Sequence, residues 1–147
     1  MKIAVISDKK NHYLKKELFC FLSKEGFEVI KLKAKKPLNI LDGCKELVQA
    51  FKNNLIDRAI VIDDYAIASF MFLAKHPSLV VAQISDEHSA MMTADHNGSN
   101  ILTFASQIST IEMMKSMSVR FLNKQYSGGR HQSRIDMLNK LLSKEAL

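Results

Sequence analysis

A pair of arginines beside two glycines is the feature of this sequence best suited to binding an anion. Gly128 and Gly129 precede Arg130 and Arg134, which are four residues apart at the start of a predicted helix. Side chains at this spacing share one face of a helix, and guanidinium groups bind phosphate through paired hydrogen bonds. Glycines let the backbone approach a ligand, and a helix N-terminus favours negative charge. The pattern predicts a phosphate site, with two solvated surface arginines as the alternative.

A histidine in the stretch Asp95-His96-Asn97-Gly98 is the second candidate. We expect a loop at His96, between a short helix and a strand. An imidazole exchanges protons near neutral pH and therefore suits acid–base catalysis. A turn with a helix-terminal histidine is the alternative, and the residues alone favour it.

Three further side chains could carry chemistry. Asp8 follows the first predicted strand, where a carboxylate can accept hydrogen bonds from sugar hydroxyls, although capping the next helix is the more common role. Cys20 and Cys44 lack metal-ligand spacing and fall inside predicted helices. We therefore expect buried, unreactive thiols and no metal site.

The elements that position these residues alternate along the chain. Apolar runs predict strands at 2–7, 27–32, 59–62, 79–84 and 101–104; amphipathic patterns predict helices at 11–24, 41–53, 66–75, 87–94 and 110–123. This alternation predicts an α/β fold, a doubly wound, Rossmann-like parallel five-stranded sheet. An extra C-terminal helix at 131–144 is free to reach a partner chain. Ligands of such sheets bind beyond the carboxyl ends of strands, here at 8–10, 63–65 and 85–86.

Composition limits the class of protein. A chain of 147 residues, 47% of them hydrophobic, suits a single domain spanning 1–147. The net charge of +6 admits nucleic acid, a membrane surface or an anionic metabolite as a partner. The basic run at 31–36 lacks interleaved aromatic residues, so we expect no nucleic acid. No stretch is apolar enough to span a bilayer or to serve as a signal peptide, so we expect a cytoplasmic protein with no membrane partner.

Two long motifs resemble a known family. SDEHSAMMTADHN at 85–97 and YSGGRHQSRIDMLNK at 126–140 are similar to the ribose-5-phosphate isomerase B and galactose-6-phosphate isomerase family, most of all to the A-type galactose-6-phosphate isomerase subunits. Weaker similarity extends through KIAVISD at 2–8 and VIDDYAIASFMFLAK at 61–75. The resemblance implies a doubly wound fold and the isomerisation of a phosphorylated aldose to a ketose. Because that reaction moves a proton through an enediolate, it needs no metal or organic cofactor.

The resemblance also implies an active site shared by two subunits. One subunit supplies a cysteine base after the third strand and a glycine-rich oxyanion loop, and its neighbour supplies a histidine and arginines. Asp63 stands at the cysteine position of this sequence, while Ala66 and Ala68 stand at glycine positions of the loop. We therefore expect this chain's own base-and-oxyanion half to be inactive.

The neighbour's half is complete in this sequence. His96 corresponds to the ring-opening histidine and Asn97 to a substrate-contacting asparagine. Arg130 and Arg134 correspond to the phosphate-binding pair, and Asp8 to an acidic residue near the substrate. The resemblance implies D-galactose 6-phosphate as substrate and a B-type isomerase subunit as partner, in a homo- or hetero-oligomer.

Two alternatives stay open. The chain could be a divergent, non-catalytic paralogue that binds a sugar phosphate or serves only as a partner subunit. It could also be a homodimeric ribose-5-phosphate isomerase in which Asp63 or Asp64 replaces the cysteine as base.

Overall fold

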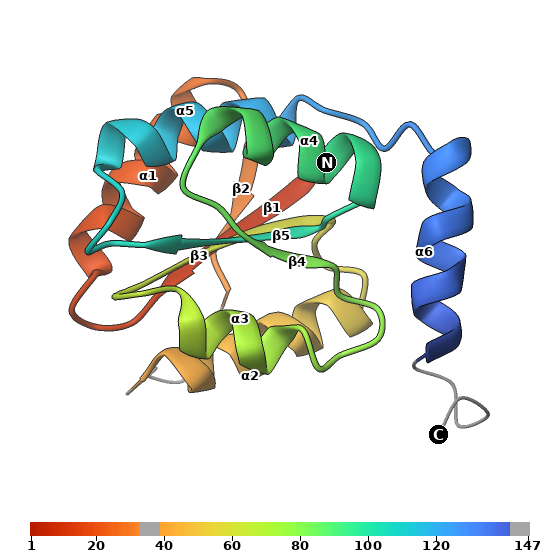
Figure 1. Ribbon diagram of the computed structural model, residues 1–147. Coiled ribbons are helices and arrows are strands. Elements are labelled where there is room, and N and C mark those ends of the chain that lie inside the picture. The colour runs from red at the N-terminus through yellow and green to blue at the C-terminus, as the bar shows by residue number, and fades with distance from the viewer. Residues whose placement is uncertain (33–38, 142–147) are drawn as a thin grey trace.

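The computed structural model describes residues 1–32 and 39–141, so part of the basic run and the last residues of the predicted C-terminal helix lie outside the described residues. Strands and helices alternate along the chain (Figure 1). They are β1 (Lys2–Ser7), α1 (His12–Lys24), β2 (Glu28–Ile30), α2 (Ile40–Lys52), β3 (Arg58–Asp63), α3 (Ile67–Leu73), β4 (Val81–Gln83), α4 (Glu87–Asn97), β5 (Ile101–Ala105), α5 (Ile111–Leu122) and α6 (Arg130–Leu141).

The strands form one parallel sheet in the order β2-β1-β3-β5-β4. The sheet grows outward in both directions from the centre, which makes it doubly wound, as predicted. β2 and β4 are its outer strands. Because every strand runs the same way, all carboxyl ends meet at one edge of the sheet and all amino ends at the other.

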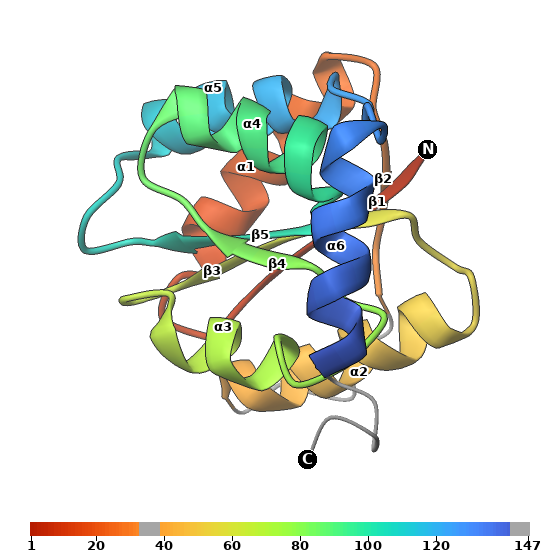
Figure 2. The same cartoon turned by 45° about the vertical axis from the view of Figure 1, so that its right-hand side comes forward.

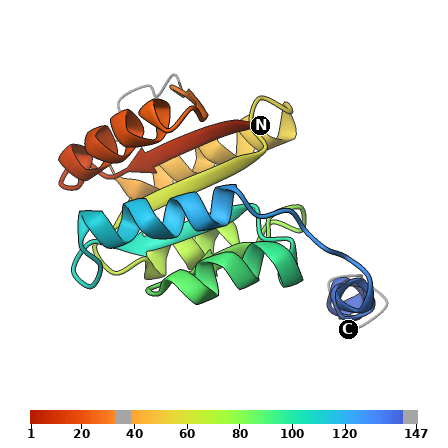
Figure 3. The same ribbon diagram turned by 90° about the horizontal axis from the view of Figure 1, so that it is seen from above.

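Helices cover both faces of the sheet. α1, α4 and α5 lie on one side and α2 and α3 on the other (Figures 1 and 3). Successive side chains of a strand point to opposite faces. Ile3 and Val5 of β1 accordingly pack in the core under α1, α4 and α5, and Ala4 and Ile6 pack in the core against α2 and α3.

The two outer strands are shorter than predicted. β2 covers 28–30 instead of 27–32, and β4 covers 81–83 instead of 79–84. Leu79 and Ile84 flank β4 and are buried, 6% and 9% exposed, although they lie outside the strand. The apolar pattern thus reports burial, while the strand itself ends where pairing with β5 ends.

The last helix stands apart from these layers. α6 runs from the level of α4, past the edge of the sheet, to the level of α2 and α3 (Figures 1 and 2). It packs against α4, and its side chains Met137 and Leu138 are 66% and 58% exposed. Across residues 1–32 and 39–141, no helix combines the length and apolar character needed to cross a bilayer.

Candidate functional site

His96 and Asn97 lie in the last turn of α4, where the sequence predicted a loop. The helix continues three residues beyond the predicted 87–94 because its stop signal is Gly98. This glycine takes a left-handed conformation, with φ of 65°, and the N–H of Ser99 donates to the carbonyl of Thr93 at 3.1 Å. A left-handed glycine with such a bond closes a helix end. The rigid final turn therefore carries both side chains.

The connector between α5 and α6 is anchored to the same turn. The backbone N–H and the hydroxyl of Ser127 both donate to the carbonyl of Asp95, at 3.0 and 3.1 Å. The Lys124 ammonium pairs with the Asp95 carboxylate at 2.9 Å, and the Tyr126 ring packs over Gly98. These contacts fix the start of α6 beside the end of α4.

The first turn of α6 brings a second histidine to the site. The ring of His131 stacks on the ring of His96, with centroids 4.1 Å apart and planes 9° from parallel. Partial burial lowers the pKa of His131, and the nearby positive groups of His96, Arg130 and Arg134 lower it further. His96 and the two arginines, 34 to 38 positions apart in the sequence, therefore surround one imidazole.

A surface cavity opens beside this cluster. It has a volume of about 440 Å³ and lies between α3, the outer strand β4 and α4. His96 and Asn97 line it from α4, with Gln83 from β4 and Phe70 from α3. The amide of Asn97 donates to the hydroxyl of Thr93 at 3.4 Å. The exposed Arg130 and Arg134 stand outside the cavity walls, on α6.

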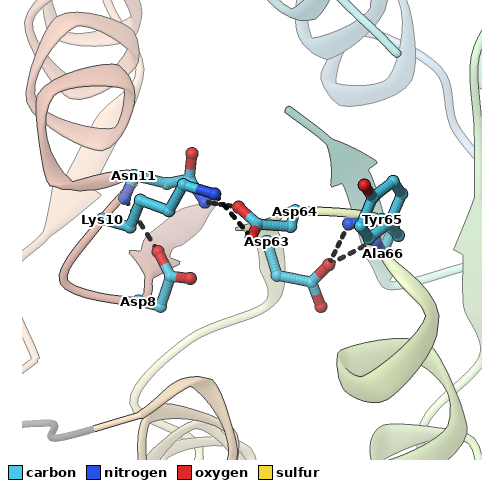
Figure 4. A network of polar contacts seen from close by, with 7 residues as sticks. All are labelled: Asp8, Lys10, Asn11, Asp63, Asp64, Tyr65 and Ala66. Atoms are coloured by element: carbon cyan, nitrogen blue, oxygen red, sulfur yellow. Dashed lines mark hydrogen bonds and ion pairs between the residues drawn. The ribbon is translucent and has the colours of Figure 1, made fainter. Parts of the chain in front are cut away.

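Asp8 does not join this cluster. It follows β1, at the carboxyl edge of the sheet, whereas α4 ends at the amino edge, next to the start of β5. One carboxylate oxygen of Asp8 accepts the backbone N–H of Asn11 at 2.8 Å, just before α1 (Figure 4). This bond lies in the turn before α1, whose N-cap residue is Asn11, so Asp8 does not cap the helix, and its contact with a sugar stays a prediction.

The carboxylate of Asp63, the last residue of β3, binds the loop that follows the strand. Asp63, 5% exposed, accepts the backbone N–H groups of Tyr65 and Ala66 (Figure 4). It also accepts the backbone N–H and the hydroxyl of Ser69. Ala66 takes a left-handed conformation, with φ of 58°, which favours glycine. Three backbone donors at this end of the loop, those of Tyr65, Ala66 and Ser69, are therefore already bonded within the chain.

The neighbouring carboxylate of Asp64 is also paired. It accepts the Lys10 ammonium at 2.8 Å and the Asn11 amide at 3.0 Å (Figure 4). These two hydrogen bonds lower the pKa of Asp64 below its usual range, and the bond from Lys10 has the larger effect. Asp64 is thus a strongly ionised, weak base.

Sequence reasoning missed His131 and misplaced one thiol. The spacing between positions 96 and 131 carries no signal for a ring stack, because the contact depends on how the connector docks.

Cys44 is buried as expected, and burial raises the pKa of its thiol to about 12. Cys20 is exposed, contrary to expectation, because it lies on the outer face of α1. In the described part of the chain, no three His, Cys, Asp or Glu residues are grouped to hold a metal.

Comparison with known proteins agrees with the architecture and the motifs. The family model described as Ribose/Galactose Isomerase matches residues 3–138. Galactose-6-phosphate isomerase subunit LacA of Clostridium acetobutylicum is 41% identical over 142 residues, covering 97% of this chain and 100% of that protein. The same subunit of Streptococcus mutans is 36% identical over 141 residues, covering 96% and 99%.

Solved structures show the same fold. Ribose-5-phosphate isomerase B of Clostridium thermocellum superposes with a TM-score of 0.88 at 27% identity, covering 99% of both chains. The enzyme of Giardia lamblia gives a TM-score of 0.81 at 29% identity, covering 92% of this chain and 96% of that one. The resemblance found in the two motifs is confirmed, and the chain belongs to the ribose/galactose isomerase family.

Proposed function

We propose that this chain is the A-type subunit of a galactose-6-phosphate isomerase, which converts D-galactose 6-phosphate to D-tagatose 6-phosphate in the cytoplasm. In this proposal it contributes half of each working active site, and a B-type subunit contributes a cysteine base and an oxyanion loop. The relatives named as the LacA subunit of this enzyme support the assignment.

One structural observation carries the division of labour. The cluster around His96 lies at the amino edge of the sheet, and the loop after β3 lies at the carboxyl edge. This separation favours a substrate that binds between two chains over one held within a single chain. Three of the backbone donors after β3, those of Tyr65, Ala66 and Ser69, are moreover bonded to Asp63. Both observations support a base supplied by another chain, and the exposed apolar side of α6, with Met137 and Leu138, is suited to contact that chain.

The proposed roles follow from the chemistry of each group. Arg130 and Arg134 bind the 6-phosphate as bidentate donors. His96 opens the sugar ring: the anomeric hydroxyl loses its proton, its C1–O bond becomes C=O, the C1–O5 bond breaks, and O5 takes a proton. Asn97 orients the open chain. The partner's base then moves a proton from C2 to C1 through the enediolate, so no metal or organic cofactor takes part.

The test is reconstitution with a B-type subunit. The lone chain should not convert D-galactose 6-phosphate, and the mixture should. His96→Ala in the mixture should lower kcat on the order of 100-fold, as loss of a general acid–base does. His88→Ala is the matched control, because His88 is exposed in the first turn of the same helix. Turnover by the lone chain, or full activity of His96→Ala, would contradict the proposal.

A second candidate function rests on the occupied loop. A paralogue that binds a phosphosugar, or serves as a partner subunit, without catalysis would also have no use for an open oxyanion site. An inactive mixture in which the phosphosugar still binds would favour this alternative. The homodimeric ribose-5-phosphate isomerase is less well supported, because Asp63 and Asp64 are both engaged in hydrogen bonds that a catalytic base would have to break.

A further inference from the structure

The stacked pair of His96 and His131 is a built feature rather than a chance contact. The two rings come from different helices and lie face to face, with their planes 9° from parallel. Backbone hydrogen bonds fix the two helix ends that carry the rings. The N–H of Ser127 donates to the carbonyl of Asp95, and the N–H of His131 donates to the carbonyl of Gly128 at 3.0 Å. The ring of His131 therefore limits how far the imidazole of His96 can rotate.

The charges around the pair oppose double protonation. Arg130 and Arg134 of α6 add permanent positive charge beside His131. Asp95 of α4 is the nearby negative group, and it is already paired with Lys124 of the connector. Two imidazolium rings with centroids 4.1 Å apart would repel each other strongly. Neutral imidazole stacks without that penalty, and so does a pair that holds one proton.

We propose that His131 is a positioning residue for His96, which fixes the plane of the catalytic imidazole by stacking. The consequence for catalysis rests on the proposed function. A ring-opening group must meet both the anomeric hydroxyl and O5, so its orientation matters as much as its protonation. The lowered pKa of His131, caused first by burial and then by its cationic neighbours, agrees with this role.

Substitutions at position 131 separate stacking from ligand binding. In the reconstituted enzyme, His131→Ala should lower kcat on the order of 10- to 100-fold and leave KM nearly unchanged. His131→Phe keeps a flat ring and should restore most of kcat. Gln132→Ala, at the exposed next position, is the control and should match wild type. Equal rises in KM for His131→Ala and His131→Phe would overturn the proposal and indicate that His131 binds the phosphate directly. Wild-type kinetics for His131→Ala would also overturn it.

A second measurement needs neither partner nor turnover. NMR of the isolated, uniformly labelled wild-type chain should show close contacts between the two imidazole rings. The pKa of His131 should lie below the ordinary imidazole value of 6.5. His96→Phe should raise the pKa of His131, because a cationic neighbour is removed. Absent ring contacts, or a pKa of His131 that His96→Phe leaves unchanged, would refute the stack even if the isomerase proposal stands. The stack can likewise be confirmed if no partner restores activity.

Discussion

The carboxylate of Asp63 should be one of the largest single contributors to the stability of this chain. It is 5% exposed and accepts the N–H of Tyr65 at 3.0 Å, the N–H of Ser69 at 3.2 Å, the N–H of Ala66 and the hydroxyl of Ser69. Asp63→Ala leaves these donors without an acceptor. Hydrogen bonds to a charged group contribute about 1.5–3 kcal/mol each but do not add fully, so we expect a total loss of about 3–5 kcal/mol.

Two companion variants sharpen this prediction. Asp63→Asn keeps one acceptor oxygen and should lose about 1–2 kcal/mol. Asp64→Ala, at the adjacent and more exposed carboxylate, is the control and should lose clearly less than Asp63→Ala. The assay is urea unfolding of the lone chain followed by circular dichroism at pH 7. A loss below about 1 kcal/mol for Asp63→Ala would refute the view that this loop is held closed by its own carboxylate.

Other expected outcomes concern the anion site, acid stability and the thiols. Loss of a clamp arginine, as in Arg130→Ala, should raise KM of the reconstituted enzyme roughly 10- to 100-fold, equivalent to about 1.5–3 kcal/mol, without changing the melting temperature. The pKa of Asp64 lies below its ordinary value of 3.8, so its pairing with Lys10 stabilises the fold above about pH 4, and this contribution is lost as the pH falls further. In urea unfolding, the difference between wild type and Asp64→Asn should therefore shrink from pH 7 to pH 3. A thiol reagent at pH 8 should label the exposed Cys20 and leave Cys44 unmodified until the chain unfolds, because the pKa of Cys44 is about 12.

The fold could be predicted from the sequence because strand and helix periods are local signals. The unbroken apolar run of Ile3, Ala4, Val5 and Ile6 predicts a buried strand, and in the structure β1 lies between two helical layers. Helix ends were harder to predict. The sequence predicted a loop at His96, next to Asn97 and Gly98, but the left-handed Gly98 ends α4 only after Asn97.

The site could be predicted only in part, because its groups meet through tertiary contacts. Arg130 and Arg134 share a helix face by spacing alone. The stack of His131 on His96 depends on the docking of Ser127 and Tyr126, which no local pattern reports. Ala66 also departs from a local rule, since its left-handed conformation is held by the buried Asp63 rather than by its own preference.

Binding of an inert substrate analogue tests the shared site most directly. A phosphorylated hydroxamate that mimics the enediolate can be titrated calorimetrically into this chain alone, into a B-type subunit alone and into their mixture. We expect tight binding only in the mixture, weakened there by Arg134→Ala in this chain. Equally tight binding to the lone chain, or binding in the mixture that is unaffected by Arg134→Ala, would show that this polypeptide does not supply the anion-binding half of the site.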